Sequence, residues 1–275
     1  MKQQIYERRE NLLDFCCKGK VKQFLRNMVL REGWTEMNTI DWSPLLLSLK
    51  IALLAVGINL LLTIPLAWIM SKRKIYLKQI WESIFILPLV LPPSVVGFGL
   101  LLLGHWLKEV LNIQIVFTWL GAFLAATIVA FPIIYQSMRS SFEAIDEQLE
   151  MAARSLGAGE WRVFWTITLP LAWPGIVSGL IMGLARALGE FGATLMIAGN
   201  IPGQTQTLAT AVYYAVEEGN WQKAGILVSI LVLICFCLIY SLNSWIPLIK
   251  KQYRMEDKDV AGQFLQKNAY VRFER

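Results

Sequence analysis

The sequence has 275 residues, of which 56% are hydrophobic and 17% charged, and its formal net charge at pH 7 is +6. A mean hydropathy of +0.49 excludes an ordinary soluble domain. The basic residues cluster just outside the long apolar stretches, which is typical of membrane topology rather than of a phosphate-binding face. We therefore expect contact with membrane lipid and none with nucleic acid.

The first 40 residues precede the apolar part of the chain. Residues 1–36 are polar, carry eight basic residues and lack the apolar core of a signal peptide. Whether this N-terminal extension belongs to the functional protein is left open by the sequence. We assign residues 41–247 to a transmembrane domain and residues 248–275 to a basic cytoplasmic tail.

Five apolar stretches approach or exceed the roughly 20 residues that a helix needs to cross a bilayer. They are Leu45–Met70, Ile80–Leu103, Ile115–Met138, Ala172–Gly199 and Ala224–Ile246. Because backbone polar groups cannot stay unpaired in lipid, these stretches are expected to be helices. The sequence therefore predicts an all-α membrane protein with five core transmembrane helices.

The connections between the stretches alternate in basic charge. Four basic residues follow the first stretch, one follows the second, three follow the third and one follows the fourth, with seven more after Pro247. Basic residues are enriched on the cytoplasmic side. This places the first and third connections and the C-terminus in the cytoplasm, although basic residues of the N-terminal extension conflict with the resulting outer N-terminus.

The second stretch contains Pro88, Pro92 and Pro93. Each proline removes a backbone donor and disfavours a continuous helix. Such breaks are tolerated in a membrane where the freed carbonyl groups face protein or a cavity. We expect a kink that shapes a pore, with a purely structural bend as the alternative.

The third connection contains an amphipathic segment, residues 142–170, which we call the bracket. Apolar residues at spacings of three and four predict a helix from Phe142 to Leu156. Gly157 and Gly159 then break the helix, and a second short element is expected to end at Pro170. Acidic residues outnumber basic ones five to three between Arg139 and Leu171, which favours a protein partner over an anionic lipid surface.

The fourth stretch carries two ionisable residues, Arg186 and Glu190, four positions apart. Such a pair lies on one helix face and neutralises itself. Ionisable residues in a span face a bundle interior or a water-filled path, so the pair lines a pore or forms a structural salt bridge. Gly183, Gly189 and Gly192 are expected to allow close helix contact, and an outer helix is expected to end near Gly219.

No catalytic or metal-binding pattern is present in the sequence. His105 is the single histidine, and the four cysteines form neither a disulfide framework nor a metal site. The sequence has no phosphate-binding loop of the kind that hydrolyses ATP. We therefore expect a non-enzyme without a cofactor.

The bracket resembles the cytoplasmic loop of permease subunits of ABC importers. The family pattern is Glu-Ala-Ala, three residues, Gly, nine residues and Ile-x-Leu-Pro, and here Ala152, Ala153 and Gly157 keep its spacing. The remaining matching residues are Ile167, Leu169 and Pro170. Met151 occupies the position of the family's glutamate, and Glu150 lies one residue earlier.

The resemblance extends over most of residues 41–245. "LPLVLPPSVVGFGLLLL" and "ARALGEFGATLMIAGNIPGQTQTLATAVY" are similar to the molybdate, tungstate and sulfate group, above all to molybdate permeases. The resemblance implies the type I importer fold in a bacterial inner membrane, a homodimeric pore, a cytoplasmic ATPase seated on the bracket and an extracytoplasmic oxyanion-binding protein. A sulfate or tungstate permease and a stand-alone secondary transporter are the alternatives.

Overall fold

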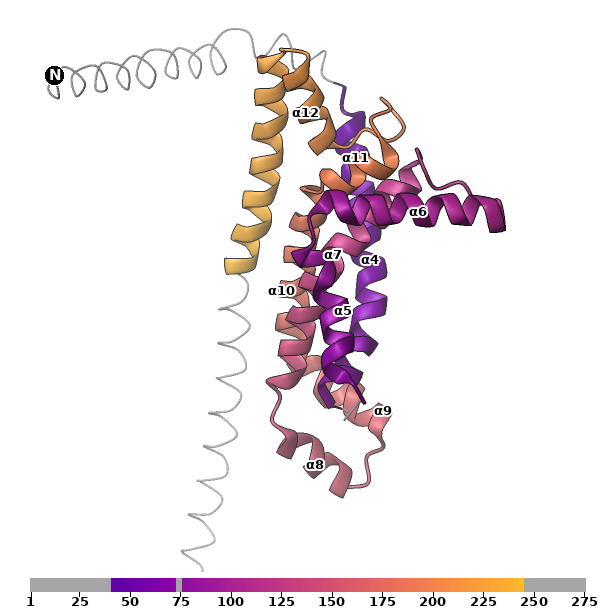
Figure 1. Ribbon diagram of the computed structural model, residues 1–275. Coiled ribbons are helices and arrows are strands. Elements are labelled where there is room, and N and C mark those ends of the chain that lie inside the picture. Colours follow the sequence, from indigo (N-terminus) through magenta and orange to yellow (C-terminus); the bar gives the residue numbers. More distant parts are fainter. Residues whose placement is uncertain (1–40, 73–75, 245–275) are drawn as a thin grey trace, which may run out of the picture.

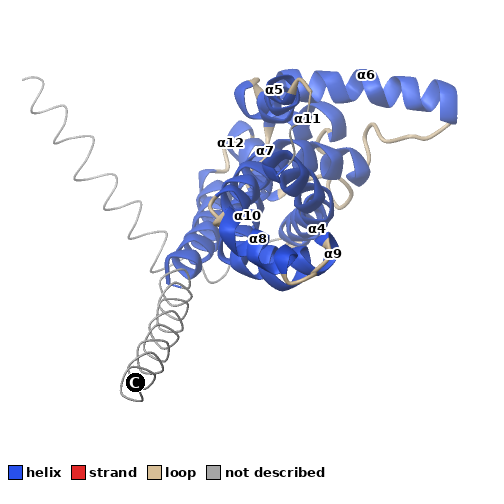
Figure 2. Ribbon diagram, turned by 90° about the horizontal axis from the view of Figure 1, so that it is seen from below, coloured by secondary structure: helices blue, strands red, loops and turns tan. Residues whose placement is uncertain are grey.

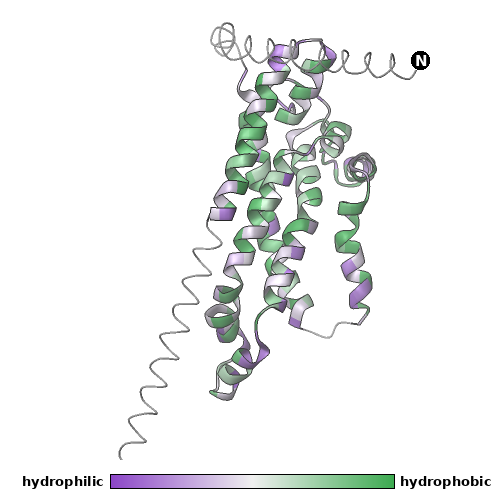
Figure 3. Cartoon of the chain, turned by 90° about the vertical axis from the view of Figure 1, so that its left-hand side faces the viewer, coloured by the Kyte–Doolittle hydropathy of each residue, from purple (hydrophilic) through white to green (hydrophobic). Residues whose placement is uncertain are grey.

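The computed structural model describes residues 41–72 and 76–244, and all regular structure within these ranges is helical. The N-terminal extension and the basic tail lie outside the described residues. Five helices in these ranges are long and apolar enough to cross a membrane, and hydrophobic residues run along their lengths (Figure 3). The all-α fold with five predicted membrane helices is confirmed.

Three long helices lie side by side and form the body of the molecule (Figure 1). They are α4 (Ser43–Lys72), α7 (Trp119–Glu143) and α10 (Leu169–Leu188). The central member is α7, because half of its most apolar window is buried and it packs against α4, α5, α10 and α11. The last described helix, Trp221–Ser244, has only 11% of its window buried and therefore lies at the edge of the bundle.

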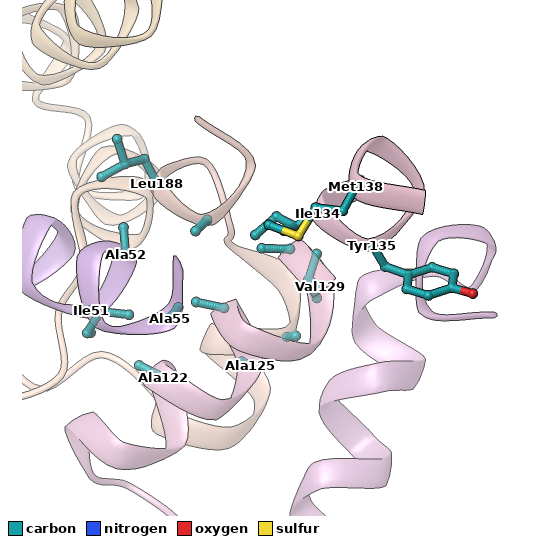
Figure 4. Packing of buried hydrophobic residues seen from close by; sticks show 14 of the residues in the cluster. Ile51, Ala52, Ala55, Ala122, Ala125, Val129, Ile134, Tyr135, Met138 and Leu188 are labelled. Atoms are coloured by element: carbon teal, nitrogen blue, oxygen red, sulfur yellow. The ribbon is translucent and has the colours of Figure 1, made fainter. Parts of the chain in front are cut away.

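Small residues bring α4 and α7 close together. Ala52 and Ala55 of α4, and Ala122 and Ala125 of α7, are fully buried in the main hydrophobic cluster (Figure 4). Without a hydrophobic driving force between helices in lipid, such close packing supplies the attraction between them. The buried Asn59 side chain adds a hydrogen bond from its Nδ2 to the Thr127 carbonyl oxygen at 3.0 Å.

A glycine row joins α10 to α7. Gly175, Gly179 and Gly183 recur every fourth residue, and a Cβ atom at each would collide with a side chain of α7. The Ser137 hydroxyl crosses the same seam and donates to the Gly175 carbonyl oxygen at 2.9 Å. The predicted close contact is thus present at Gly183 but not at Gly189, which caps the end of α10 and has open space around it apart from its own helix.

The second predicted span is two helices rather than one kinked helix. They are α5 (Lys78–Val90) and α6 (Pro93–Leu111), and α6 lies across the direction of the other helices (Figure 1). The residue before a proline is pushed into an extended conformation, and consecutive prolines do this twice. Leu91 and Pro92 are extended, and Pro93 opens α6. Pro88 does not interrupt a helix: it lies inside α5.

The fourth predicted span, to Gly199, also ends earlier than expected. The α10 helix stops at Leu188, and a short helix, α11 (Gly192–Ala198), follows after a turn. The outer helix α12 (Leu208–Glu217) is followed by Gly219 at φ 73°, which agrees with the predicted end. The ends of the first, third and fifth stretches agree with the structure within a few residues, as far as the described residues extend.

The bracket lies at one end of the bundle, and α11 and α12 lie at the other (Figure 1). Its helices, α8 (Glu147–Ser155) and α9 (Glu160–Val163), lie across the ends of α4 and α10 when the molecule is seen from that end (Figure 2). The end of α4 and the start of α5 are at the bracket end. The connections that the charge pattern assigns to one side therefore share one side of the structure.

Candidate functional site

The bracket begins with a capped helix instead of continuing α7. The predicted helix Phe142–Leu156 is wrong in its first part, because α7 ends at Glu143 and a turn separates it from α8. Asp146 causes this break, since its side chain accepts a hydrogen bond from the Gln148 backbone N–H at 2.9 Å. An aspartate in this position satisfies a donor that the first turn of a helix leaves unpaired.

Gly157 ends α8, as predicted, through a defined capping motif. The N–H of Ala158 donates to the Ala153 carbonyl oxygen at 3.1 Å, and the N–H of Gly157 donates to the Arg154 carbonyl oxygen at 2.9 Å. This pair of bonds is the Schellman motif, which requires a left-handed residue after the helix. Gly157 supplies it with φ 85°, while a side chain there would meet open space.

The second element of the bracket does not end at Pro170, contrary to the prediction. A wide π-helical turn, η2 (Phe164–Thr168), follows α9 and continues directly into α10. Proline lacks an N–H, and in an α-helix its ring collides with the carbonyl group four residues earlier. The wider π turn directly precedes the proline and contains Thr166, the residue four positions earlier, so the backbone departs from α-helical geometry where the collision would fall.

A buried carboxylate ties the bracket to the membrane helices. Glu150 is 2% exposed and is the only residue of α8 that is buried. Its carboxylate accepts a hydrogen bond from Thr168 Oγ1 at 2.9 Å and pairs with Lys72 Nζ, at the end of α4, at 3.1 Å. Arg154 Nη2 lies 3.5 Å from its other oxygen. The burial is tolerable because the charge is paired and hydrogen-bonded.

Arg154 links this carboxylate to the next helix. Its guanidinium donates two hydrogen bonds to Glu160 at the start of α9, from Nε at 2.7 Å and from Nη2 at 3.2 Å. These bonds, with smaller contributions from nearby acids, raise the pKa of the Arg154 guanidinium. A cavity of 270 Å³ adjoins the charges and is lined in part by Trp68 of α4. The sequence does not identify either Lys72 or Thr168 as a partner of Glu150.

The bracket exposes several large apolar residues among polar ones. Leu156 at its tip is 90% exposed, and Met151 is 49% exposed. The other large exposed apolar residues of this surface are Leu149, Trp161 and Trp165. Among the remaining motif residues, Ala152 is exposed, Ala153, Ile167 and Leu169 are half-buried, and Pro170 is exposed. The polar Glu150 thus points inward and the apolar Met151 outward, which suits docking against another protein.

The second group of candidate residues meets at the opposite part of the bundle. Arg186 Nη1 lies 2.8 Å from Glu190 Oε2, which confirms that the two side chains pair. They do not share one helix, because α10 has ended at Leu188 before Glu190. The other Glu190 oxygen accepts the N–H of Ala193 at 2.9 Å. Glu190 therefore fixes the turn between α10 and α11, which we call the elbow (residues 189–192).

The elbow packs against the proline break of the second span. A Cβ atom on Gly192 would lie 3.0 Å from Pro93 Cβ, and one on Gly97 would lie 2.7 Å from Met196 Cβ. The two irregular parts of the membrane domain thus lie together. Of the pore candidates, Pro93, Gly192, Glu190 and its partner Arg186 are brought to one region, with Pro92 next to Pro93, whereas Pro88 lies within α5.

An ion network that the sequence did not reveal joins α5 to α7. Arg139 Nη1 lies 3.0 Å from Glu82 Oε2, and Arg139 Nε donates to Glu143 at 2.8 Å. Lys78 lies within 4 Å of both acids, at 3.7 and 3.9 Å. The spacing of four in Lys78–Glu82 and in Arg139–Glu143 is a readable signal, whereas the contacts that join α5 to α7 are distant in sequence. Because α5 has no buried residue, this network and the contacts of Phe85 with α7 hold α5 in place.

A family model described as binding-protein-dependent transport system inner membrane component matches residues 63–251. A Bacillus subtilis protein, provisionally named a molybdenum transport system permease, is 44% identical over 207 residues, covering 72% of this chain and 91% of its own. The molybdenum transport system permease protein ModB of Escherichia coli K12 is 39% identical over 219 residues, covering 77% and 96%.

A protein of Marchantia polymorpha, provisionally named a sulfate transport system permease, is 32% identical over 241 residues, covering 84% of this chain and 83% of its own. Among solved structures, the inward-facing MetNI methionine ABC transporter is similar with a TM-score of 0.64. That match has 15% identity and covers 78% of this chain and 97% of the other. The structural likeness concerns the fold alone.

Proposed function

The chain belongs to the family of binding-protein-dependent transport system inner membrane components, and we propose that it is the pore subunit of an ATP-driven molybdate importer. The bracket carries this proposal. It exposes large apolar residues beyond the ends of the membrane helices, at a position where a cytoplasmic ATPase can seat against it. Closure of the ATPase then moves the bracket as a rigid body.

The preference for molybdate rests on the relatives. The two named for molybdenum transport are 44% and 39% identical to this chain, whereas the one named for sulfate transport is 32% identical. Molybdate, tungstate and sulfate are tetrahedral dianions of the same charge. A separate extracytoplasmic binding protein therefore selects among them, and the pore conducts what that protein delivers.

We assign one partner protein to each end of the helix bundle. The ATPase contacts Leu149, Met151 and Leu156 of the bracket, all of which are exposed. An apolar Met151 in place of the family's glutamate makes this contact apolar rather than ionic. The binding protein docks at the α11–α12 end. A second copy of the chain completes the pore, and lipid covers the remaining apolar helix faces.

The orientation follows from charge. Lys72, at the end of α4, pairs with Glu150 of the bracket, and the basic connections assign that end of the structure to the cytoplasm. In that orientation the last helix runs toward the cytoplasm, so the basic tail after it is cytoplasmic. ATP hydrolysis takes place on the partner chain, since this sequence has no phosphate-binding loop.

Transport proceeds by alternating access. The elbow and the proline break pack against each other, and both lie where the membrane helices are interrupted. Interrupted helices are common at the binding sites of membrane transporters. We infer that this region changes shape when the bracket moves. Arg186 and Glu190 brace it, and a passing oxyanion competes for Arg186 only while the pair is open.

The proposal is tested by reconstitution of the chain with its ATPase in proteoliposomes. Labelled molybdate uptake is measured with and without internal ATP, and with and without the binding protein. Uptake that needs both supports the proposal, whereas equal flux without ATP would support a secondary transporter instead. Competition by excess sulfate or tungstate then identifies the cargo, and displacement of molybdate by sulfate at equal concentration would refute the molybdate assignment.

The same assay distinguishes the pore role from that of a membrane-anchored scaffold. If the bracket served only for docking, its tip could be altered with no effect on uptake once the complex had formed. Leu156→Asp places a charge on the most exposed apolar residue of the bracket surface, where the free protein tolerates it. We expect weaker ATPase binding and a proportional loss of uptake, and normal uptake despite lost binding would refute the pore role.

A further inference from the structure

We propose that Glu150 is a positioning residue that makes the bracket, the end of α4 and the start of α10 move as one body during transport. This inference rests on the proposed function and deepens it. It concerns the inward face of α8, whereas the partner ATPase is expected to contact the outward face.

The contacts of Glu150 come from three different elements. Lys72 belongs to α4, Thr168 to the π turn that enters α10, and Arg154 to α8 itself. The first two contacts span 78 and 18 residues of sequence. A single carboxylate therefore joins the first membrane helix and the start of the fourth to the helix that meets the ATPase.

The other residues of α8 make few contacts with the helix bundle. Glu150 is its only buried residue, and the elements that α8 contacts most are α9 and η2. The apolar contact to α4 is made instead by Phe164 of η2, whose ring centroid lies 5.0 Å from that of Trp68. The direct attachment of α8 to α4 thus depends on Glu150.

Burial makes this attachment hard to break. If α8 moved away from α4, the carboxylate would lose its lysine partner while still shielded from water, and an unpaired buried charge is strongly unfavourable. An apolar residue in its place would let the surfaces slide past each other, since apolar contacts have no direction. The ion pair instead fixes the distance between the two helices, so a displacement of α8 displaces α4.

The first experiment compares Glu150→Gln with Glu147→Gln in the purified complex with the ATPase. Glu147 lies on the same helix and is exposed, and its replacement by glutamine removes the same charge. ATP hydrolysis, molybdate uptake and the amount of bound ATPase are measured in the same proteoliposomes. For Glu150→Gln we expect bound ATPase and hydrolysis within about twofold of the unmodified complex, with uptake per ATP reduced at least tenfold.

Uptake per ATP that is unchanged, or that falls equally in Glu147→Gln, would overturn the positioning role. If Glu150→Gln failed to fold, the same question is answered by a covalent tie. Cysteines are placed at positions 72 and 150 in a chain whose four native cysteines are replaced by serine, and a short bifunctional thiol reagent joins them.

Joining the two positions restores uptake per ATP if the helices stay together throughout the cycle, which is the expected result. Abolished transport after joining would show that α8 and α4 must separate, and would overturn the inference. Absence of ATP-driven uptake in the unmodified complex would instead overturn the proposed function itself, and the inference with it. The two failures are thereby distinguished.

Discussion

Replacing Gly179 with alanine tests the packing of α10 against α7 most sharply. The added Cβ would lie 2.8 Å from the Cβ and 3.0 Å from the Oγ of Ser137. Carbon atoms in favourable contact lie roughly 3.5–4.0 Å apart. The two helices must therefore separate by about 1 Å, or Ser137 must shift and weaken its hydrogen bond to the Gly175 carbonyl oxygen.

Two unfavourable contributions and one favourable contribution determine the change in the free energy of unfolding. Overpacking a close interface costs about 1–3 kcal/mol, and the strained hydrogen bond costs about 1 kcal/mol more. Alanine regains up to about 1 kcal/mol relative to glycine inside a helix. The expected net loss for Gly179→Ala is therefore about 1–3 kcal/mol. Gly57 is the matched control, because it lies within α4 with nothing inside 4 Å of an added Cβ, so Gly57→Ala gains stability.

The assay is thermal unfolding of both purified variants in the same detergent, followed by tryptophan fluorescence. We expect the melting temperature of Gly179→Ala to lie below that of Gly57→Ala by on the order of 5–10 °C. Equal or higher stability of Gly179→Ala would contradict the argument, because it would mean that α10 and α7 do not approach closely at this position.

Two further changes test the bracket and the elbow. Gly157→Ala forces alanine into a left-handed conformation at a cost of about 1–2 kcal/mol, so ATPase binding should weaken by about 5–30-fold. The control Gly159→Ala should leave ATPase binding unchanged, because Gly159 has φ −70° and open space around it. Equal effects of the two substitutions on ATPase binding would refute the capping role. Glu190→Leu leaves the Arg186 charge without its partner and should lower the free energy of unfolding by about 3–5 kcal/mol, most of which the double variant Arg186→Leu/Glu190→Leu should recover. Thermal unfolding measures both variants, and a double variant as unstable as the single one would contradict the prediction.

The membrane helices and the bracket could be predicted because their signals are local. Long apolar runs, the glycine at position 157 and the Ala-Ala spacing each determine structure within a few residues. The predicted pairing of Arg186 with Glu190 is confirmed for the same reason. The Gly175–Gly179–Gly183 row was also readable, since its spacing of four is itself a helix-contact pattern, but only its last member was identified.

The errors arose where a residue's effect depends on its neighbours. Proline was expected to interrupt helices at positions 88 and 170, yet both lie inside or at the start of a helix. Asp146 competed with the helix periodicity and divided the predicted helix by capping α8. The contact between Lys72 and Glu150 joins residues 78 positions apart, so only the folded chain brings them together.

The most direct test of the central claim is ATP-driven molybdate uptake by proteoliposomes that contain this chain, its ATPase and the binding protein. We predict uptake against a concentration gradient that stops when ATP is omitted and falls with ATPase binding when the bracket surface is altered. Uptake that continues at the same rate without ATP, or with the bracket surface disrupted and the ATPase unbound, would contradict the account.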